Sequence, residues 1–319
     1  MNPSQFVQEL FASTSFTGRP NGLYEPIEYT MKLGGKRLRP QLLLWTVDLF
    51  GGDYHAAAPA ALAVETFHNY TLLHDDLMDQ SPLRRGQPTV YLKWNANVAI
   101  LSGDTMMGLA WQHLLRQPCT NPVALFQCFN NTAIGVFEGQ QLDMEFEQRD
   151  DVTIAEYMEM IRLKTAVLLA GALQMGAIVA DAPSDDISHL ISFGEHLGLA
   201  FQLQDDLLDA YGDTRVLGKQ TGQDIIDRKK TYLLLKATEL STEQEALQLK
   251  ALYNSAVDAS HKVPQVIACY DRLHVKEAVV QKIDAEFQLA EQALARVDRD
   301  EAHKSGLRQL AQSLLGRQK

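Results

Sequence analysis

The stretch Glu65-Thr-Phe-His-Asn-Tyr-Thr-Leu-Leu-His-Asp-Asp-Leu-Met-Asp79 ends an apolar, alanine-rich segment in three carboxylates, Asp75, Asp76 and Asp79. Residues four apart lie on one face of a helix, so Asp75 and Asp79 present neighbouring carboxylates with Asp76 beside them. Two unit charges about 5 Å apart repel by roughly 3 kcal/mol at an effective dielectric near 20. We therefore predict a helix whose acidic end holds a positively charged group.

The same spacing returns in Phe201-Gln-Leu-Gln-Asp-Asp-Leu-Leu-Asp209, with Asp205 and Asp209 at its ends. One acidic triplet is often a solvated helix end, because acids are common on protein surfaces. Two triplets with identical DDxxD spacing argue against that interpretation. Opposing carboxylates suit a hard divalent cation such as Mg²⁺, which takes oxygen ligands and usually keeps waters and substrate phosphate oxygens.

The composition indicates an all-α protein. Hydrophobic residues make up 46% of the 319 residues, whereas glycines (20) and prolines (11) are few, and long β-branched or alternating runs are absent. No linker rich in Pro, Gly or Ser interrupts the chain, so a single helical domain is predicted over residues 1–319. The net charge of −11 argues against a nucleic-acid surface as the main function.

The expected helices are long and are separated by short polar or glycine-rich junctions. The N-terminal helical segments break at Gly34-Gly35, after which Pro40 can begin the next helix. Ser81–Pro88 is expected to be a loop, and Ser241 is an N-cap candidate for the first of three final helices. The helices expected between these points are Ala56–Asp79, Thr89–Gln117, Pro122–Glu147, Val152–Ala180, Asp185–Tyr211 and Asp224–Leu240.

The cysteines and the hydrophobic pattern indicate the cellular compartment in which the protein is expected. Cys119, Cys128 and Cys269 form neither a CxxC pair nor an even framework, which favours a reducing, cytoplasmic setting. The N-terminus lacks the basic flank and apolar core of a signal peptide, and no run reaches about 18 uncharged apolar residues. We expect a soluble protein without a transmembrane segment.

Basic residues gather at helix ends and junctions, although the chain as a whole is acidic. Metal held by carboxylates and faced by Lys and Arg is the arrangement that a diphosphate requires, because arginine forks bind phosphate oxygens bidentately. No Ser/His/Asp or Cys/His grouping suggests a protein nucleophile. The basic residues concerned are Lys36, Arg37, Arg39, Arg84, Arg85, Lys164, Lys219, Arg228, Lys229 and Lys230.

Several motifs occur in the order found in trans-isoprenyl diphosphate synthases, which form the polyprenyl synthetase family. Over Gly34 to Leu235 the chain resembles the short-chain members of this family, the farnesyl and geranylgeranyl diphosphate synthases. These motifs are GGKRLRP, HDDLMD, LRRGQP, the Lys164-Thr165 pair, FQLQDDLLD and the Gly218-Lys219 loop. The resemblance implies an all-helical bundle around a deep central cavity, with the two acidic helices facing each other across it. It also implies a homodimer.

The resemblance further implies the substrates and their ligands. Isopentenyl diphosphate and an allylic diphosphate would condense head to tail with Mg²⁺, of which three ions are expected. Asp75, Asp79 and Asp205 would bind the metal, assisted by Asp76 and Asp209. Arg84, Lys164, Lys219 and Gln202 would hold the allylic diphosphate, joined by Lys229 from the basic run. Gly35, Lys36, Arg39, His68 and Arg85 would hold isopentenyl diphosphate.

The mechanism implied by the family proceeds by ionisation. Metal ions and lysines stabilise the departing diphosphate, the isopentenyl double bond attacks the allylic cation, and the released diphosphate takes the proton. The carbonyl near Lys164-Thr165 and the Gln202 side chain would steady the cation. By the family's rule, an aromatic five positions before the first Asp, here Tyr70 followed by the small Thr71, floors the pocket. Family members that make long quinone tails tend to have a small residue at this position, so the resemblance predicts products of about fifteen to twenty carbons.

Two other functions remain open at this point. A class I terpene cyclase shares the helical bundle, but its second metal motif mixes Asn, Ser or Thr and Glu, and it would leave Lys36, Arg39 and Arg85 unexplained. A non-catalytic or regulatory subunit of a heteromeric prenyl synthase generally loses one Asp-rich motif, whereas both are intact here. Arg317 and Lys319 resemble a basic tail that closes over the site in some members, with a frayed terminus as the alternative.

Overall fold

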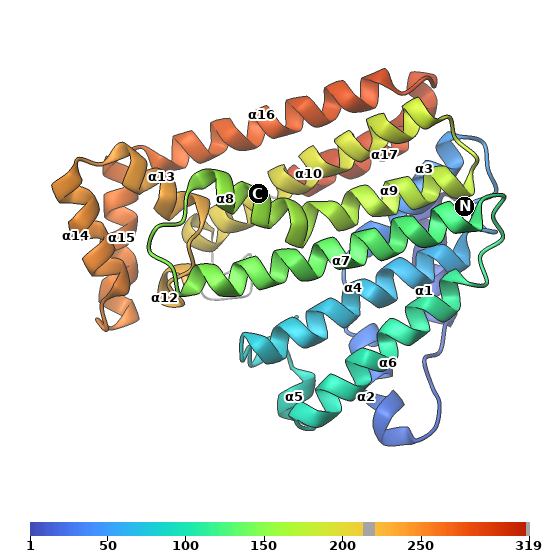
Figure 1. Cartoon of the computed structure of the whole chain (residues 1–319), viewed down its shortest axis with the longest axis horizontal. Helices are drawn as coiled ribbons and strands as arrows, with labels where there is room; N and C mark the ends of the chain where they lie inside the picture. The colour runs from blue at the N-terminus through green and yellow to red at the C-terminus, as the bar shows by residue number, and fades with distance from the viewer. Residues whose placement is uncertain (213–220, 317–319) are drawn as a thin grey trace. The chain divides into compact units, whose positions relative to one another are not determined.

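The computed structural model describes residues 1–212 and 221–316, which are almost entirely helical (Figure 1). The only sheet within these residues is a hairpin in which Leu83–Arg84 (β1) pairs antiparallel with Gln87–Pro88 (β2). The expected all-α class is confirmed.

The chain divides into two compact units. The first comprises residues 1–129, 172–187 and 298–307, and the second comprises residues 130–171, 188–297 and 308–319. Most of the boundaries fall within helices, so these helices contribute residues to both units. They are α7 (Pro122–Glu147), α9 (Val167–Val179), α10 (Ser184–Tyr211) and α17 (Glu301–Leu315). The single domain over residues 1–319 stays a prediction.

The first unit is organised around α4 (Ala58–Met78), which packs against α3 and α6. Its first turns carry Ala60, Ala61 and Ala63, all with no exposed surface, because such small side chains let neighbouring helices approach closely. Further along, Leu73 joins an apolar cluster with residues of the neighbouring helices. The other helices of this unit are α1 (Pro3–Ser13), α2 (Asn21–Lys32), α3 (Leu38–Leu49), α5 (Val90–Lys93) and α6 (Ala96–Leu114).

The second unit has its own apolar core, in which Leu203 of α10 packs with buried tyrosines such as Tyr253 and Tyr270. A π-helical segment interrupts its helices at Arg162–Ala166 (η1). The remaining elements are α8 (Ile154–Ile161), α12 (Gln223–Ile226), α13 (Tyr232–Leu240), α14 (Glu243–Asn254), α15 (Ala259–Arg272) and α16 (Val275–Arg296).

Two of the expected helices are broken. The segment Thr89–Gln117 contains α5 and α6, because Asn95 takes an extended backbone and its side chain accepts a hydrogen bond from the Val98 N–H as the N-cap of α6. The segment Asp224–Leu240 is divided into α12 and α13, with the basic run Arg228-Lys-Lys230 between them and Arg228 in a left-handed conformation. The expected helix Val152–Ala180 is helical throughout most of its length but contains η1.

Three smaller expectations were wrong. Ser241 is the C-cap of α13, and Thr242 is the N-cap of α14 because it forms a capping box with Glu245. Helix α3 begins at Leu38 rather than Pro40; a proline in the first turn is tolerated because its missing N–H would have no intrahelical partner. Four helices, α14 to α17, follow α13 in the described chain instead of three.

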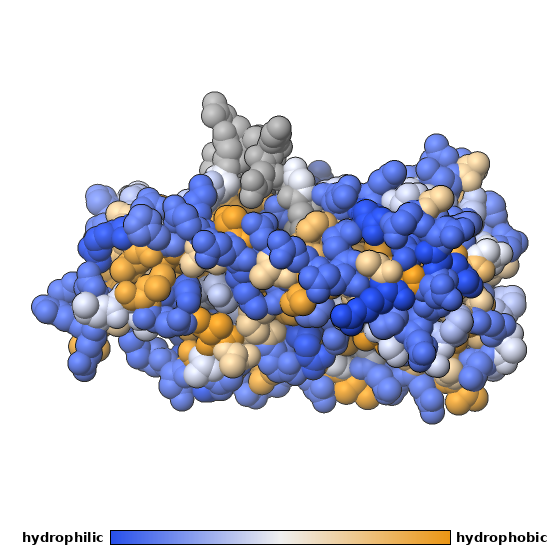
Figure 2. All heavy atoms as spheres, turned by 90° about the horizontal axis from the view of Figure 1, so that it is seen from above, coloured by the Kyte–Doolittle hydropathy of each residue, from blue (hydrophilic) through white to orange (hydrophobic). Residues whose placement is uncertain are grey.

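One helical segment among the described residues, Ile154–Val179, is long and apolar enough to cross a membrane by length and composition alone. Of its most apolar window, 72% is buried inside the protein, as is also found for core helices of soluble proteins. On the face seen in Figure 2, hydrophilic side chains predominate and apolar ones are scattered among them. This face therefore does not resemble a lipid-facing belt.

Candidate active site

The first Asp-rich motif lies at the end of α4. The helix ends at Met78, and Asp79 is its C-cap, with its backbone N–H donating to the Asp75 carbonyl. Asp79 is exposed, Asp75 is half-buried and Asp76 is buried. The predicted helix with an acidic end is confirmed, and it presents Asp75 and Asp79 to solvent while it turns Asp76 inward.

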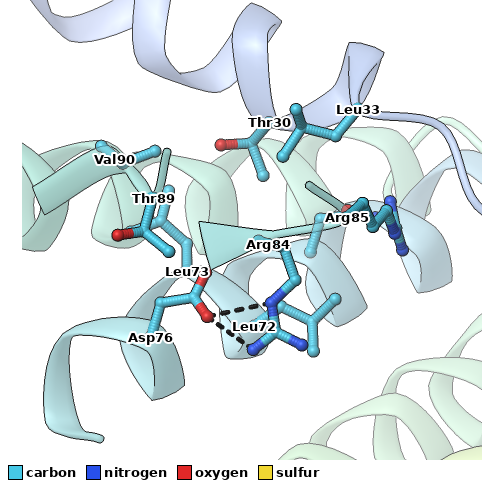
Figure 3. A pocket seen from close by; sticks show the side chains of 10 residues that line it. Thr30, Leu33, Leu72, Leu73, Asp76, Arg84, Arg85, Thr89 and Val90 are labelled. Atoms are coloured by element: carbon cyan, nitrogen blue, oxygen red, sulfur yellow. Dashed lines mark hydrogen bonds and ion pairs between the residues drawn. The ribbon is translucent and has the colours of Figure 1, made fainter. Parts of the chain in front are cut away.

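Arg84 of β1 supplies the positive charge that the motif was expected to need. Its Nε and Nη2 donate to Asp76 Oδ1 at 2.9 and 2.5 Å (Figure 3), and Nη2 lies 3.7 Å from Asp75 Oδ2. Burial raises the pKa of the Asp76 carboxyl, and the Arg84 hydrogen bond opposes that shift. The guanidinium therefore offsets part of the desolvation cost that burial imposes on the charged carboxylate.

The segment expected to be a loop is the β1–β2 hairpin, whose turn consists of Arg85 and Gly86. Both have positive φ, 54° and 75°, as a type I′ turn requires. In Figure 3 the Arg84 side chain points towards Asp76, whereas Arg85 points away from it. The hairpin therefore aims two adjacent arginines at different targets. A small pocket beneath it is lined by Thr30, Leu33, Asn69, Leu72, Leu73, Asp76, Arg84, Arg85, Thr89 and Val90.

The target of Arg85 is the loop Gly34–Arg37. Arg85 Nη1 donates to the Gly34 carbonyl, and a Cβ at Gly35 would lie 2.6 Å from Arg85 Nη2. Gly35 also has φ 121°, a conformation in which side chains are strained. Only glycine at position 35 therefore lets the Arg85 guanidinium lie against the loop, next to the exposed Lys36.

Arg39 and His68 form the other part of this basic cluster. Arg39 Nη1 lies 3.0 Å from His68 Nε2. Burial, together with the charges of Arg39 and Arg85, holds the pKa of His68 well below its usual value, so His68 is neutral at physiological pH. Because arginine only donates, Nε2 is the acceptor and the imidazole proton resides on Nδ1. Burial lowers the pKa of Arg39 to about 10, which leaves the guanidinium charged.

In the second unit, the Lys164-Thr165 pair lies within the π-helix η1. A Cβ at Gly139 of α7 would lie 2.2 Å from the Lys164 backbone nitrogen, and a Cβ at Gly198 of α10 would lie 2.4 Å from Ala166 Cα. Two glycines therefore let neighbouring helices approach the η1 backbone closely. Lys164 Nζ lies 2.6 Å from Asp143 Oδ2. Single π turns in α-helices are frequent at functional sites.

The second Asp-rich motif is connected to η1 by hydrogen bonds. Thr165 Oγ1 donates to Gln202 Oε1 at 2.9 Å, and Gln202 Nε2 donates to Asp206 Oδ1 at 3.0 Å. Tyr157 donates its hydroxyl to the other Asp206 oxygen. Burial and the nearby Asp224 raise the pKa of Asp206 well above its usual value, while these hydrogen bonds oppose the shift.

Asp205 and Asp209 differ in their surroundings. Asp205 is half-buried, whereas Asp209 is buried and its Oδ2 accepts a hydrogen bond from the Asp224 backbone N–H at 3.0 Å. Asp209 therefore fixes the start of the segment that leads to Lys229, which is half-buried. The Tyr253 hydroxyl donates to the Lys229 carbonyl at 2.7 Å.

The residues expected to set product length lie one turn before the first motif. Tyr70 is half-buried, packs edge-on against His74 with ring centroids 4.7 Å apart, and joins the apolar cluster of the first unit. Thr71 donates its hydroxyl to the His68 carbonyl at 2.8 Å. The Tyr70 ring is therefore held in place by packing, while Thr71 adds little bulk beside it.

Sequence reasoning missed several residues of these networks. Asp206 was not named as a site residue although it lies inside the second DDxxD motif. Asp143, the partner of Lys164, belongs to no recognisable sequence motif. The structure brings Arg39 to His68, Arg85 to Gly34, and Thr165 to Gln202. Lys219, Arg317 and Lys319 lie outside the described residues. The expectation that the two acidic helices face each other stays a prediction.

The donor chemistry of the Asp-rich motifs fits Mg²⁺. Among the described residues, no group of three or more His, Cys, Asp or Glu side chains already forms a metal site. Mg²⁺ does not require one, since it is usually bound through one or two carboxylates plus waters and substrate phosphates. Asp75 and Asp79 at the end of α4, and Asp205 on α10, supply such carboxylates.

Comparisons with known proteins agree with this chemistry. A model of the polyprenyl synthetase family matches residues 20–270. The geranylgeranyl diphosphate synthase of Sulfolobus acidocaldarius is 42% identical over 239 residues, which cover 73% of this chain and 72% of that protein. The chain superposes on a crystal structure of a geranylgeranyl pyrophosphate synthase with a TM-score of 0.94 at 39% sequence identity, and the superposition covers 100% of each chain. A polyprenyl synthase from Caulobacter crescentus CB15, complexed with calcium and isoprenyl diphosphate, has a TM-score of 0.88 at 29% identity and covers 99% of this chain and 94% of that one.

Proposed function

The chain belongs to the polyprenyl synthetase family, and we propose that it condenses isopentenyl diphosphate with an allylic diphosphate, head to tail and in trans. The proposed product has about fifteen to twenty carbons, a length consistent with a pocket floored by an aromatic ring. It is a short-chain trans-prenyltransferase. The observation that carries the proposed substrate assignment is the convergence of Arg39, His68, Arg85 and the Gly34–Arg37 loop beside the acidic end of α4.

We assign isopentenyl diphosphate to Gly35, Lys36, Arg39, His68 and Arg85. The support is electrostatic: the charges of Arg39 and Arg85 act on a neutral imidazole whose Nδ1–H is a donor, and the nearest loop has no side chain at position 35. Guanidinium groups match the geometry of phosphate oxygens. A doubly charged headgroup would complete this cluster.

The allylic diphosphate is assigned to Arg84, Lys164, Gln202 and Lys229, with Lys219 outside the described residues. Arg84 and Lys164 are held by the carboxylates of Asp76 and Asp143, so both are oriented before the substrate arrives. Asp75, Asp79 and Asp205 would hold Mg²⁺, assisted by Asp76 and Asp209, and we propose three ions. When bound, the metal supplies positive charge that stabilises the leaving diphosphate; the calcium and isoprenyl diphosphate of the Caulobacter relative support a divalent cation.

Thr165 and Gln202 are proposed to steady the allylic cation. The Thr165 hydroxyl donates to Gln202 Oε1, and Gln202 Nε2 donates to Asp206, so the amide is fixed with its oxygen towards η1. Fixed dipoles stabilise developing charge without the cost of reorganisation. The proton lost after carbon–carbon bond formation passes to the released diphosphate, as the mechanism of the family implies.

A homodimer in the cytoplasm is also proposed. Ile100 and Leu101 on α6 are 44% and 59% exposed, and exposed apolar side chains on one helix favour an interface. No disulfide joins any two of the described residues Cys119, Cys128 and Cys269, in keeping with a reducing compartment. The cyclase and the non-catalytic subunit are not favoured, since both Asp motifs and the isopentenyl-side cluster are complete.

One incubation tests the proposal. The purified protein is mixed with Mg²⁺, radiolabelled isopentenyl diphosphate and each allylic diphosphate in turn, and the dephosphorylated products are separated by chromatography. We expect elongation to about fifteen to twenty carbons, and its loss when the metal is chelated. Absence of elongation with every primer would refute the proposed reaction, and hydrocarbon release would indicate a cyclase.

A further inference from the structure

Arg37 differs from the basic residues on either side of it in the GGKRLRP motif. Lys36 is exposed, but the Arg37 side chain is only 6% exposed, and its Nη1 lies 2.9 Å from Oε1 of Glu65, whose side chain is 2% exposed. Both charges are removed from solvent and pair through Glu65 Oε1, whereas Glu65 Oε2 is buried and has no hydrogen-bond partner among the described residues. Arg37 is therefore not available to a diphosphate, although the sequence places it among the candidate phosphate ligands.

Glu65 connects this ion pair to the proposed isopentenyl diphosphate site. It lies on α4 one turn before His68 and Asn69, and Asn69 Nδ2 donates to Glu65 Oε1 at 3.0 Å. Burial lowers the pKa of Arg39 and of Arg85, and the Glu65 carboxylate opposes both shifts. Glu65 is therefore a common counter-charge for Arg37, Arg39 and Arg85.

The loop that presents Lys36 is held by three side chains. Gln41 donates Nε2 to the Lys36 carbonyl at 2.6 Å, Arg85 donates to the Gly34 carbonyl, and Arg37 of the loop donates Nη2 to the Met31 carbonyl of α2. Arg37 itself has φ 50°, which a residue other than glycine adopts only when its surroundings impose it. The Glu65 ion pair supplies that constraint.

We propose that the buried Arg37–Glu65 pair is a positioning device that fixes the Gly34–Arg37 loop so that Lys36 and Arg39 meet the diphosphate of isopentenyl diphosphate. The inference rests on the proposed function, and it assigns Arg37 and Glu65 to positioning rather than to contact with substrate. Its alternative is a purely electrostatic role, in which the Glu65 charge weakens the field that attracts the diphosphate.

The two roles predict opposite signs for Glu65→Gln. Removing a negative charge close to Arg39 and Arg85 would by itself attract a diphosphate more strongly and lower the KM for isopentenyl diphosphate. Loss of the loop constraint instead raises that KM, because displacement of binding groups by about 1 Å reduces transition-state stabilisation by up to about a hundredfold. We expect a rise of about tenfold or more, with the KM for the allylic diphosphate unchanged within about twofold.

The experiment uses steady-state kinetics of the full chain with one substrate varied and the other saturating. The matched control is Glu291→Gln, which removes the same charge from an Arg–Glu pair with Arg308 (2.8 Å) outside the proposed site. Circular dichroism of each variant reports folding. Wild type that fails to elongate any primer would refute the proposed function itself; active wild type with an unchanged or lower KM for isopentenyl diphosphate in folded Glu65→Gln would overturn the positioning role.

Breaking a buried ion pair leaves an unpaired charge and is strongly destabilising. If Glu65→Gln does not fold, two less destabilising variants test the positioning role. Gln41→Met removes the hydrogen bond to the Lys36 carbonyl without changing any charge. Arg37→Lys keeps the charge but loses the fork that reaches both Glu65 and the Met31 carbonyl. A selective rise in the KM for isopentenyl diphosphate in both supports the proposal, whereas equal changes for both substrates, or none, contradict it.

Discussion

Gly139→Ala should displace the π-helix and reduce prenyl transfer about a hundredfold while the protein stays folded. The added Cβ would lie 2.2 Å from the Lys164 nitrogen, 2.7 Å from Lys164 Cα and 2.7 Å from the Leu163 carbonyl carbon. All three are backbone atoms, so no side-chain rotation relieves the clash. Ordinary van der Waals contact begins near 3.4 Å, and α7 and η1 must therefore separate locally by about 1 Å, because packed interiors have no free space to absorb the methyl group.

The expected changes in folding free energy and in kcat/KM can be estimated separately. Overpacking of this kind costs about 1–3 kcal/mol, while replacing a helical glycine by alanine returns up to about 1 kcal/mol. The net loss of folding free energy is therefore at most about 3 kcal/mol. Displacement of catalytic groups by about 1 Å costs about a hundredfold in rate, so kcat/KM is expected to fall by roughly that factor.

Gly135→Ala is the matched control because it lies one turn earlier on the same helix. A Cβ there meets only the Val167 and Leu163 side chains, no closer than 3.5 Å. This variant should gain helix propensity and keep wild-type kcat/KM. Elongation assays and urea unfolding of both variants make the comparison. If Gly139→Ala retained the activity of Gly135→Ala, the close approach of α7 to η1 would have no role in placing Lys164.

Four other substitutions test the remaining assignments. Asp75→Ala or Asp205→Ala should abolish elongation because each removes a proposed metal ligand; turnover near the wild-type rate in a radiolabel assay would remove that residue from the metal site. Tyr70→Ala should lengthen the product by opening the floor of the pocket, and an unchanged chromatographic profile would argue against this role. Tyr253→Phe removes the hydroxyl that binds the Lys229 carbonyl at 2.7 Å; we expect about 1 kcal/mol lower stability and a higher KM for the allylic diphosphate, and unchanged kinetics would show that the Lys229 segment does not need this contact.

Local sequence was sufficient for the parts of the fold that depend on helical periodicity and on punctuation. The helix ending near Asp79, the helix Pro122–Glu147 and the helix carrying the second DDxxD motif follow from apolar spacing and from the residues that end them. The carboxylates at the end of α4 also required a counter-charge on electrostatic grounds, and Arg84 provides it. These features are encoded within a few turns of the chain.

Other features depend on contacts between distant segments and could not be predicted in the same way. The π-helix at Arg162–Ala166 lies against Gly139 and Gly198, and its own sequence carries no π signal. The hairpin turn uses Arg85 and Gly86 rather than the usual Asn-Gly. The burial of Arg37 depends on Glu65, 28 positions away in the chain, so an arginine count alone could not distinguish the structural arginine from the ligands.

A protein carboxylate already holds two of the cations assigned to diphosphate binding. Arg84 is held by Asp76, and Lys164 is held by Asp143. Such a pair orients the cation, but it also competes with the incoming substrate for the same donor atoms. For Arg84, whose partner is buried, orientation dominates, because removing one member of a buried pair is costly. For Lys164 the balance is different.

Asp143→Asn should tighten the binding of the allylic diphosphate. The Lys164 and Asp143 side chains are 24% and 19% exposed, and a pair open to solvent contributes at most about 1 kcal/mol. Removing this competitor lowers the dissociation constant by up to about fivefold, which calorimetric titration without isopentenyl diphosphate measures. The control is Asp151→Asn, which neutralises an exposed carboxylate 2.8 Å from Arg149 and should change nothing. A weaker affinity in Asp143→Asn would mean that the carboxylate positions Lys164 for the substrate, and that this positioning outweighs competition in this partly buried pair.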